Sequence, residues 1–298
     1  MSKDRPDEST RFAMVPERLN PGGDHAIADI PLVVGADDPA ARDAAETLFS
    51  SITETVPVAS TETAELSKTV ENTYRMVNIA LVNQLVALAE RLDADVWEAI
   101  DAAGTKPFGF QAFEPGPGVG GHCIPIDPQF LLWRANELGT ELPFIEHAHE
   151  VNEGMPERVV EGVTTALKAR GVAVDEASVL AFGAAYKPNV GDPRHSPAIE
   201  VFEGLCRHTN VTLVDPHVDS GEMTVPVTAT VSDETIEMSD AVVLLVDHDV
   251  FDLDRLGEHA SFVYDAKNAM PSDTSATVVT LGENVESEPV VIGGNARE

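Results

Sequence analysis

Residues 178–206 read SVLAFGAAYKPNVGDPRHSPAIEVFEGLC, and this stretch decides the fold of the C-terminal part. The apolar run at its start has the length of a buried strand, and the segment near 197–208 has helical spacing. Further apolar runs bounded by turn residues occur at 211–216, 241–248 and 262–266, with another helical stretch near 233–238. Strands that alternate with helices predict an α/β fold with a doubly wound parallel sheet.

The N-terminal part carries a shorter β/α pattern. Apolar runs of strand length occur at 12–15, 30–35 and 55–60, and residues 37–51 resemble a helix. A fragment of this length does not close a sheet by itself. We therefore expect it to be the tail of a larger domain.

Between these parts lies the clearest single element, a helix predicted over residues 61–92. Apolar residues recur every three or four positions, which indicates a helical stripe. The stripe consists of Val70, Tyr74, Val77, Leu81, Leu85, Leu88 and Leu92, and a second row of Ile79, Val82, Val86 and Ala89 widens the face expected to be buried. At 1.5 Å per residue the helix would be roughly 45 Å long, typical of a domain centre or a dimer contact. Shorter helices are predicted at about 95–103, 128–138 and 153–170.

The charge balance is strongly acidic, with 51 acidic and 19 basic residues and a net charge of −32. Such a surface repels nucleic acid and anionic membranes. Disorder is the first alternative for so acidic a chain, but the periodic apolar residues favour a folded protein with an acidic surface, as in salt-loving microbes. The absence of a long apolar run and of a secretory signal predicts a cytoplasmic protein.

The cysteines and histidines indicate no metal or disulfide framework. Two cysteines, Cys123 and Cys206, are too few to hold a chain of 298 residues together by disulfides. The nine histidines show no spacing typical of a zinc site. We therefore expect no metal.

The strongest local motif is the glycine- and proline-rich loop EPGPGVGGHCIPIDP at 114–128. Gly116, Gly118 and Gly120 allow the backbone to approach a ligand closely, and Cys123 with Asp127 four residues later suits covalent catalysis by a thiol. The alternative for an isolated motif of this kind is a tight loop with an incidental, inert cysteine.

Three further motifs carry charge. Lys68, Asn72 and Arg75 share one face of the long helix, where the alternative is a salt-bridged seam with Glu65 and Glu71. Residues 185–197 follow a strand and open a helix, so that Lys187 and Arg194 are placed for phosphate, or are ordinary loop charges. The fourth motif, PERLNPG at 16–22, offers Glu17 as a general base or a plain surface charge.

The order and spacing of these four motifs resemble the UDP-glucose/GDP-mannose dehydrogenase family over nearly all of residues 12–270. Within the family they are most similar to the UDP-N-acetylmannosamine dehydrogenases. The marks are PER-x-x-PG, K-x-x-E-N-x-x-R, PGPGVGGHC-x-x-x-DP and Y-K-P-x-x-x-D-x-R-x-S-P. Pro21 and Arg75 favour the N-acetylhexosamine group, whereas Phe108 stands near a place where relatives often carry a basic residue.

The resemblance implies a four-electron, NAD-dependent oxidation of a sugar C6 alcohol to a carboxylate, in polysaccharide or glycan precursor synthesis. Cys123 would form a thiohemiacetal and then a thioester, with Lys68 and Asn72 assisting at the C6 oxygen. Glu17 and Asp127 would orient or deprotonate the hydrolytic water. The residues expected to hold the UDP-sugar are Arg18, Leu19, Arg75, Gly116, Gly118, Gly120, Lys187 and Lys267, and Arg194 would reach toward the cofactor.

The resemblance also implies three regions: residues 1–59 as a remnant of an NAD-binding domain, 60–171 as a central helical domain that forms a dimer, and 172–298 as a UDP-sugar-binding domain. No GxGxxG motif, the usual dinucleotide signature, occurs in the sequence. Three explanations follow: a shortened reading frame, a partner chain that supplies NAD binding, or a non-catalytic UDP-sugar-binding or dimerising fragment.

Overall fold

The N-terminal piece is a small β–α–β unit. The computed structural model describes residues 10–19, 23, 25–219, 221 and 225–285. It contains, in order, the 3-10 helix η1 (Ile27–Asp29), strand β1 (Leu32–Gly35), helix α1 (Pro39–Phe49) and strand β2 (Thr55–Val58). β1 and β2 pair in parallel, and Met14 makes an isolated antiparallel bridge to Gly35. The strand predicted at 12–15 is thus a single bridge, whereas the other three elements are confirmed.

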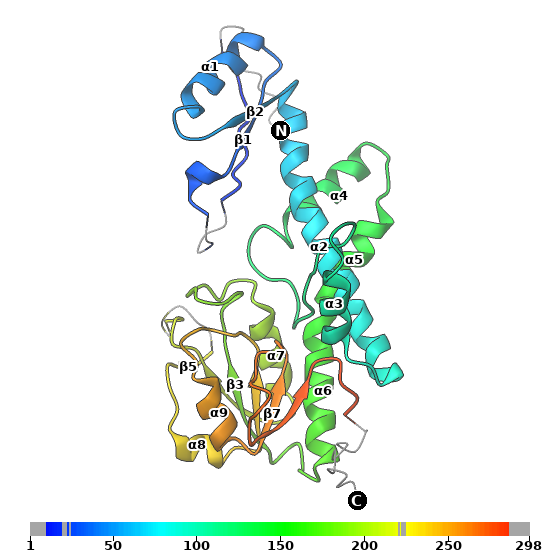
Figure 1. Ribbon diagram of the computed structural model, residues 1–298, viewed down its shortest axis with the longest axis vertical. Helices are drawn as coiled ribbons and strands as arrows, with labels where there is room; N and C mark the ends of the chain where they lie inside the picture. Colours follow the sequence, from blue (N-terminus) through cyan, green and yellow to red (C-terminus); the bar gives the residue numbers. More distant parts are fainter. Residues whose placement is uncertain (1–9, 20–22, 24, 220, 222–224, 286–298) are drawn as a thin grey trace, which may run out of the picture.

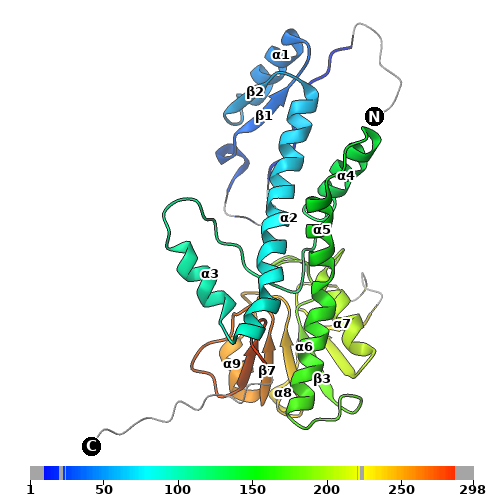
Figure 2. The ribbon, with the colours of Figure 1, turned by 90° about the vertical axis from the view of Figure 1, so that its right-hand side faces the viewer.

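Helix α2 (Thr61–Leu92) has the predicted bounds, and its caps explain them. The side chain of Ser60 accepts a hydrogen bond from the amide of Thr63 at 3.1 Å, which satisfies one of the free donors of the first turn. At the other end Asp93 takes a left-handed conformation with φ of 53°, which ends the helix. Figures 1 and 2 show α2 extending from the N-terminal piece to the C-terminal sheet.

The expected burial of the apolar stripe on α2 is wrong for most of its members. Within the chain the buried face consists of small and polar residues together with Met76, Val82 and Val86, whereas Leu81 and Leu88 are 54% and 51% exposed. The second row was the better guide, because Val82, Val86 and Ala89 are buried. Both rows are apolar, so periodicity alone does not tell which one faces the rest of the chain.

The central helices pack along α2. They are α3 (Val96–Gly104), α4 (Asp127–Glu137), α5 (Pro143–Glu153) and α6 (Met155–Ala169). Three of them confirm the predicted helices, and α5 was not predicted. Met76 and Ala80 of α2 bury against Ala148 of α5, and Ile124 from the loop before α4 packs on this cluster. Figure 2 shows α5 alongside α2.

The C-terminal unit is a six-stranded parallel sheet with strand order β5-β4-β3-β6-β7-β8. Its elements are β3 (Ser178–Phe182), α7 (Pro197–Cys206), β4 (Asn210–Val214), β5 (Val227–Thr228), α8 (Asp233–Glu237), β6 (Ala241–Leu244), α9 (Leu253–His259), β7 (Phe262–Asp265) and β8 (Thr277–Thr280). The predicted doubly wound sheet is confirmed. The two edge strands β5 and β8 and the short helix α9 were not predicted.

Helices cover both faces of this sheet. Alternate strand residues enter different cores: Val179 and Ala181 pack with α6 and α7, and Leu180 and Phe182 pack with α8 and α9. The first core also takes in the end of α2 and the buried side of α3, and the indole of Trp97 donates a hydrogen bond to the carbonyl of Leu281 at 2.9 Å. The sheet is therefore joined to the long helix through a continuous core.

Candidate active site

Cys123 lies in the loop that connects α3 to α4, which we call the thiol loop (residues 114–126). The amides of Ile126 and Asp127 both donate to the carbonyl of Cys123, at 3.2 and 2.8 Å, so a tight turn sets the thiol just before α4. Gly118 and Gly121 have φ of +133° and +87°, a region that side chains disfavour. The side chain of Cys123 is exposed, as a reactive thiol requires.

The polar face of α2 meets this loop. Asn72 is buried, and its amide nitrogen donates to a carboxylate oxygen of Asp127 at 2.5 Å. Lys68, one helical turn before Asn72, is half-buried, and no hydrogen bond or ion pair engages its ammonium within the described residues. The structure thus brings Asn72 into contact with Asp127, which follows Cys123 by four positions. The ammonium of Lys68 is left without a partner among the described residues. Arg75, on the next turn, is exposed.

A buried amide network, which sequence reasoning missed, holds the start of the thiol loop. Asn83 of α2 accepts a hydrogen bond from the amide of Gly116 at 3.0 Å and donates to the side chain of Asn152 at 3.0 Å. Asn152 in turn donates to the carbonyl of Met76 at 3.1 Å. An asparagine within an apolar helix was the available signal, because a buried amide needs partners.

The PER segment contacts α2 through its arginine. Arg18 forms an ion pair with Glu71 at 2.8 Å and donates to the carbonyl of Pro31. Glu71 is therefore the partner of Arg18, and the alternative in which it pairs with Lys68 is wrong. Glu17 is exposed and accepts from the amide of Leu19 at 2.6 Å. Pro21 lies outside the described residues.

A basic pocket lies where the order of the strands in the parallel sheet reverses. β3 has β4 on one side and β6 on the other, which is where open α/β sheets bind ligands. The pocket of about 60 Å³ is lined by Lys187 after β3, Lys267 after β7, Asp247 after β6, the first turn of α7 and two residues of the thiol loop, Pro117 and Gly118. A helix N-terminus with two lysines suits a phosphate group.

The thiol loop reaches this pocket directly. A β-carbon added at Gly116 would lie 4.0 Å from the ammonium nitrogen of Lys267. Lys267 is placed by the buried carboxylate of Asp265, which accepts from its amide at 2.9 Å, and its ammonium lies 3.7 Å from Asp247. Gly118 lines the same pocket. The cysteine loop and the two lysines thus share one site.

Buried residues fix the loop that carries Lys187. Asp215, at the end of β4, accepts from the amides of Ala184 and Ala185 at 2.7 and 3.1 Å and pairs with His248 at 3.1 Å. Although burial raises the pKa of Asp215, the hydrogen bonds from His248 and the backbone lower it to about 2. His248 accepts from the amide of Asn189 at 2.9 Å, so its other ring nitrogen carries the proton that faces Asp215.

Arg194 and Phe108 make contacts of their own. Arg194 binds the carboxylate of Asp192 with two nitrogens, at 2.9 and 2.8 Å, and this hydrogen bonding lowers the pKa of Asp192 to about 2. The ring of Phe108 is 71% exposed and lies 4.9 Å from the ammonium nitrogen of Lys106.

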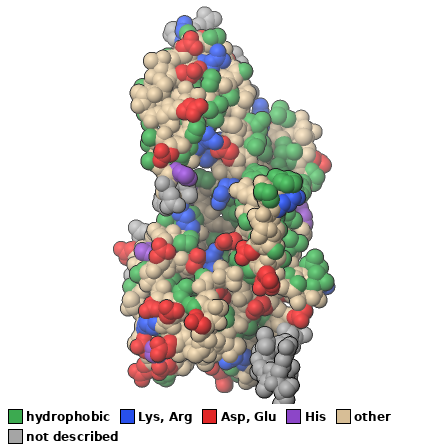
Figure 3. Space-filling view, in the orientation of Figure 1, with side chains coloured by type: hydrophobic (Ala, Val, Ile, Leu, Met, Phe, Trp, Pro, Cys, Tyr) green, Lys and Arg blue, Asp and Glu red, His purple; other side chains and the backbone are tan. Residues whose placement is uncertain are grey.

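Figure 3 shows a hollow between the N-terminal piece and the C-terminal sheet, with Lys and Arg side chains around it. On a chain with net charge −32, such a local gathering of positive charge marks a place where an anion is attracted. The described residues include no cluster of three metal-ligating side chains. They also include no helix with the length and hydropathy needed to cross a membrane.

The turn after β1 does not suit a dinucleotide. The turn after β1 is Ala36-Asp37-Asp38, and the carboxylate of Asp38 caps α1 by accepting from the amide of Ala40 at 2.8 Å. Carboxylates at a helix N-terminus would repel a pyrophosphate. This turn therefore offers no pyrophosphate site.

The fold and the basic pocket define an α/β protein with an anion-binding type of pocket at the edge of a parallel sheet. Models of the UDP-glucose/GDP-mannose dehydrogenase family match residues 62–154 with the central domain and residues 180–272 with the UDP binding domain. The chain belongs to this family.

Individual relatives carry related names. A UDP-N-acetyl-D-mannosamine dehydrogenase of Methanococcus maripaludis is 35% identical over 269 residues, which cover 87% of this chain and 60% of the relative. A UDP-N-acetyl-D-glucosamine 6-dehydrogenase of Pseudomonas aeruginosa is 32% identical, with coverages of 87% and 64%. The structure of a UDP-D-ManNAc dehydrogenase of Pyrococcus horikoshii superimposes with a TM-score of 0.79 and 28% identity, with coverages of 92% and 65%. The chain thus spans about 60% of the length of the curated relatives it matches.

Proposed function

We propose that this chain supplies the sugar-nucleotide site and the thiol of a nucleotide-sugar 6-dehydrogenase. The favoured substrate is a UDP-N-acetylhexosamine, with UDP-N-acetylmannosamine first, because the curated relatives are named as dehydrogenases of such sugar nucleotides. The observation that carries the proposal is the shared site: Gly118 of the thiol loop lines the same pocket as Lys187 and Lys267. A diphosphate held there would place the attached sugar near Cys123.

The chemistry assigned to this chain begins with an aldehyde at C6. The thiolate of Cys123 attacks C6, the S–C bond forms, and the carbonyl electrons move to the C6 oxygen, which takes a proton. Lys68 has no partner among the described residues, so its ammonium is free to give that proton or stabilise the oxyanion.

The second step assigned to this chain is hydrolysis of the C6 thioester. Water adds to the acyl carbon, the S–C bond breaks, the thiolate leaves, and a base takes the proton of the water. Asp127 is the first candidate for that base. It follows Cys123 by four positions, and the hydrogen bond from Asn72 fixes its carboxylate. Glu17 is the second, although no hydrogen bond among the described residues joins it to the loop.

The two hydride transfers of the family reaction need NAD. The turn after β1 does not suit a pyrophosphate, so we derive no step through NAD and assign Arg194 only a prospective role toward it. The proposal includes a partner chain, or further polypeptide, that binds the cofactor. In the proposed sequence of reactions, the product uronate enters polysaccharide or glycan precursor synthesis.

Calorimetric titration with UDP and with UDP-N-acetylmannosamine tests the sugar-nucleotide site. Loss of one charged contact costs about 1.5–3 kcal/mol, so Lys187→Ala and Lys267→Ala should each weaken binding about ten- to a hundred-fold. Lys168→Ala, at an exposed position of α6, is the matched control and should bind as the parent does. Unchanged affinity in both pocket variants would refute the site.

A non-catalytic UDP-sugar-binding fragment is the second candidate, favoured by the misfit of NAD to the turn at Asp37 and Asp38. Absorbance of NADH at high salt, with UDP-N-acetylmannosamine and NAD present, separates the two. Turnover that disappears in Cys123→Ser establishes the enzyme. Tight UDP-sugar binding without NADH, even after a longer homologue is added, establishes the binding fragment.

The exposed apolar row of α2 supports a homodimer as part of the proposal. Leu66, Val70, Tyr74, Leu81, Leu85, Leu88 and Leu92 are each at least 39% exposed. A row of this length on one helix is typical of a surface that a partner covers. Light scattering should show a dimer that Leu81→Asp with Leu88→Asp dissociates, whereas Leu48→Asp on α1 leaves the mass unchanged. A monomeric parent protein would contradict the dimer.

A further inference from the structure

The aromatic ring of Tyr186 lies directly on the backbone of the thiol loop. A β-carbon at Gly121 would lie 3.0 Å from two ring carbons of Tyr186, and one at Gly120 would lie 2.8 Å from its β-carbon. Gly120 is enclosed further by the carbonyl of His195, 2.7 Å from the same added atom. These distances leave no room for a side chain, so both glycines permit a close-packed contact two and three residues before Cys123.

The same tyrosine also belongs to the basic pocket. Tyr186 lines it beside Lys187, whose ammonium nitrogen lies 5.6 Å from the centre of the tyrosine ring, within reach of a cation–π attraction. The amide of Tyr186 donates to the carbonyl of Asp192 at 3.0 Å, which closes the loop that carries Lys187. One residue therefore contacts both the anion-binding lysine and the backbone that presents the thiol.

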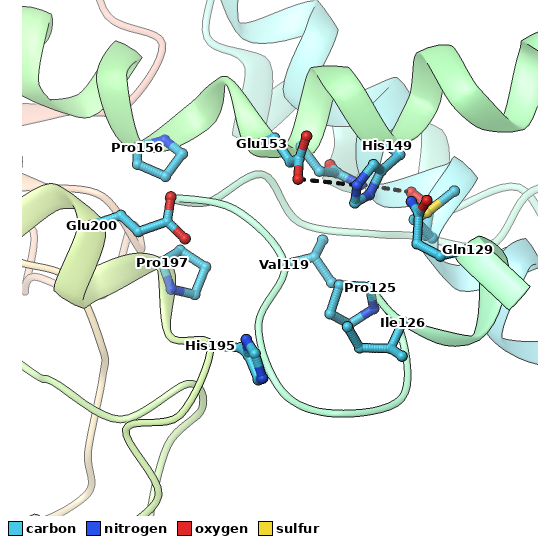
Figure 4. Close-up of a pocket in the computed structure, with 12 residues that line it drawn as sticks. Val119, Pro125, Ile126, Gln129, His149, Glu153, Pro156, His195, Pro197 and Glu200 are labelled. Atoms are coloured by element: carbon cyan, nitrogen blue, oxygen red, sulfur yellow. Dashed lines mark hydrogen bonds and ion pairs between the residues drawn. The ribbon is translucent and has the colours of Figure 1, made fainter.

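The thiol loop has space into which it can shift. A cavity of about 210 Å³ is lined by Val119, Pro125 and Ile126 of this loop, by α5 and by the first turn of α7. Figure 4 shows the loop curving between the side chains of α5 and the segment of His195. A loop that is tightly packed at its glycines and borders a cavity elsewhere is displaced as a unit when the packed side moves.

We propose that Tyr186 is a positioning residue that couples occupancy of the basic pocket by a nucleoside diphosphate to the reactivity of the Cys123 thiol. The inference rests on the proposed function, because it takes the pocket to bind the diphosphate. A diphosphate draws the ammonium of Lys187 toward itself, and the ring of Tyr186 shifts with that ammonium. Because the ring packs on Gly121, its shift also moves Gly121 and the thiol of Cys123. The coupling is reciprocal, as linkage requires.

The protonation state of the Tyr186 hydroxyl supports a role for the ring and not for a phenolate. Burial, followed by the charges of Asp192 and Cys123, raises the pKa of Tyr186, so the hydroxyl stays protonated at neutral pH. Replacement by phenylalanine keeps the ring and removes the hydroxyl, which makes it the informative conservative variant. Replacement by leucine removes the flat surface on which the glycines rest.

The test measures the rate at which iodoacetamide alkylates Cys123, between pH 6 and 9, with and without saturating UDP. The background is Cys206→Ser, because Cys206 is the other exposed thiol. UDP lacks the hexosyl group of the substrate, so it does not cover the thiol directly. We expect UDP to change the rate at least about five-fold in this background. The Tyr186→Phe protein should keep the effect, and the Tyr186→Leu protein should lose it while calorimetry still detects UDP.

The matched control is Tyr74→Leu, an exposed tyrosine of α2, which should keep the full effect of UDP. If the Tyr186→Leu protein fails to fold, Gly121→Ala provides the same decoupling by pushing the ring from the loop side. UDP binding without any change in the alkylation rate, or an effect that survives in Tyr186→Leu or Gly121→Ala, overturns the coupling alone. Failure of UDP to bind the parent overturns the proposed function and the coupling with it.

Discussion

Replacement of Asn83 by alanine should be among the most damaging single changes near the site. The side chain of Asn83 is 1% exposed and satisfies two buried groups, the amide of Gly116 and the side-chain oxygen of Asn152. Alanine leaves both without a partner. Each unsatisfied buried group costs about 1–3 kcal/mol, so unfolding should become easier by about 2–6 kcal/mol.

Guanidinium unfolding, followed by circular dichroism and tryptophan fluorescence, measures this loss. Asn136→Ala, at an exposed position of α4, is the matched control and should change the free energy of unfolding by less than about 0.5 kcal/mol. In a Cys206→Ser background, Asn83→Ala should also change the rate at which Cys123 is alkylated, because the amide of Gly116 then loses its hydrogen-bond partner. A loss below about 1 kcal/mol would show that the network does not hold the loop, because water or a local shift then replaces it.

Three further outcomes are expected. The hydrogen bond that the His259 ring donates to the Glu237 carboxylate, followed by the charges of nearby carboxylates, raises the pKa of His259. The contribution of His259 to stability should be full below pH 6.5 and should fade as pH rises through the higher folded pKa. Proton NMR titration should show a smaller pKa shift in Glu237→Gln. The pKa of Asp215 is lowered to about 2. Its contribution to folding stability is therefore present above the unfolded pKa of about 3.9 and is lost as pH falls toward 2. Acid unfolding monitored by circular dichroism should move to higher pH in His248→Ala. Gly183→Ala should destabilise far more than Gly171→Ala in thermal melts: both have positive φ, but the added atom meets Val246 at 2.4 Å in the first and open space in the second.

The local motifs were predictable because their chemistry lies within short segments. The thiol loop (114–126), the Lys68-Asn72-Arg75 face and the Lys187 loop (185–197) each contain their glycine, charged or capping residues within one short segment. The caps of α2 and the apolar runs of β3, β4, β6 and β7 likewise act locally, so the bounds of α2 and the first residues of these strands agree with the prediction to within one residue. The strands end earlier than the apolar runs, as β6 does at Leu244. β5, with two residues, is too short for periodicity to detect.

The remaining features depend on which segments meet. The sequence by itself determined the doubly wound sheet, the long helix and the order of the motifs, since these follow from periodicity and from residue types at fixed spacing. Only the tertiary structure decided that α2 buries its small and polar face, that Asn83 holds Gly116, and that Tyr186 lies on Gly121. These contacts join residues 33 or more positions apart, as for Asn83 and Gly116, and a repeat along one segment carries no information about its distant partner.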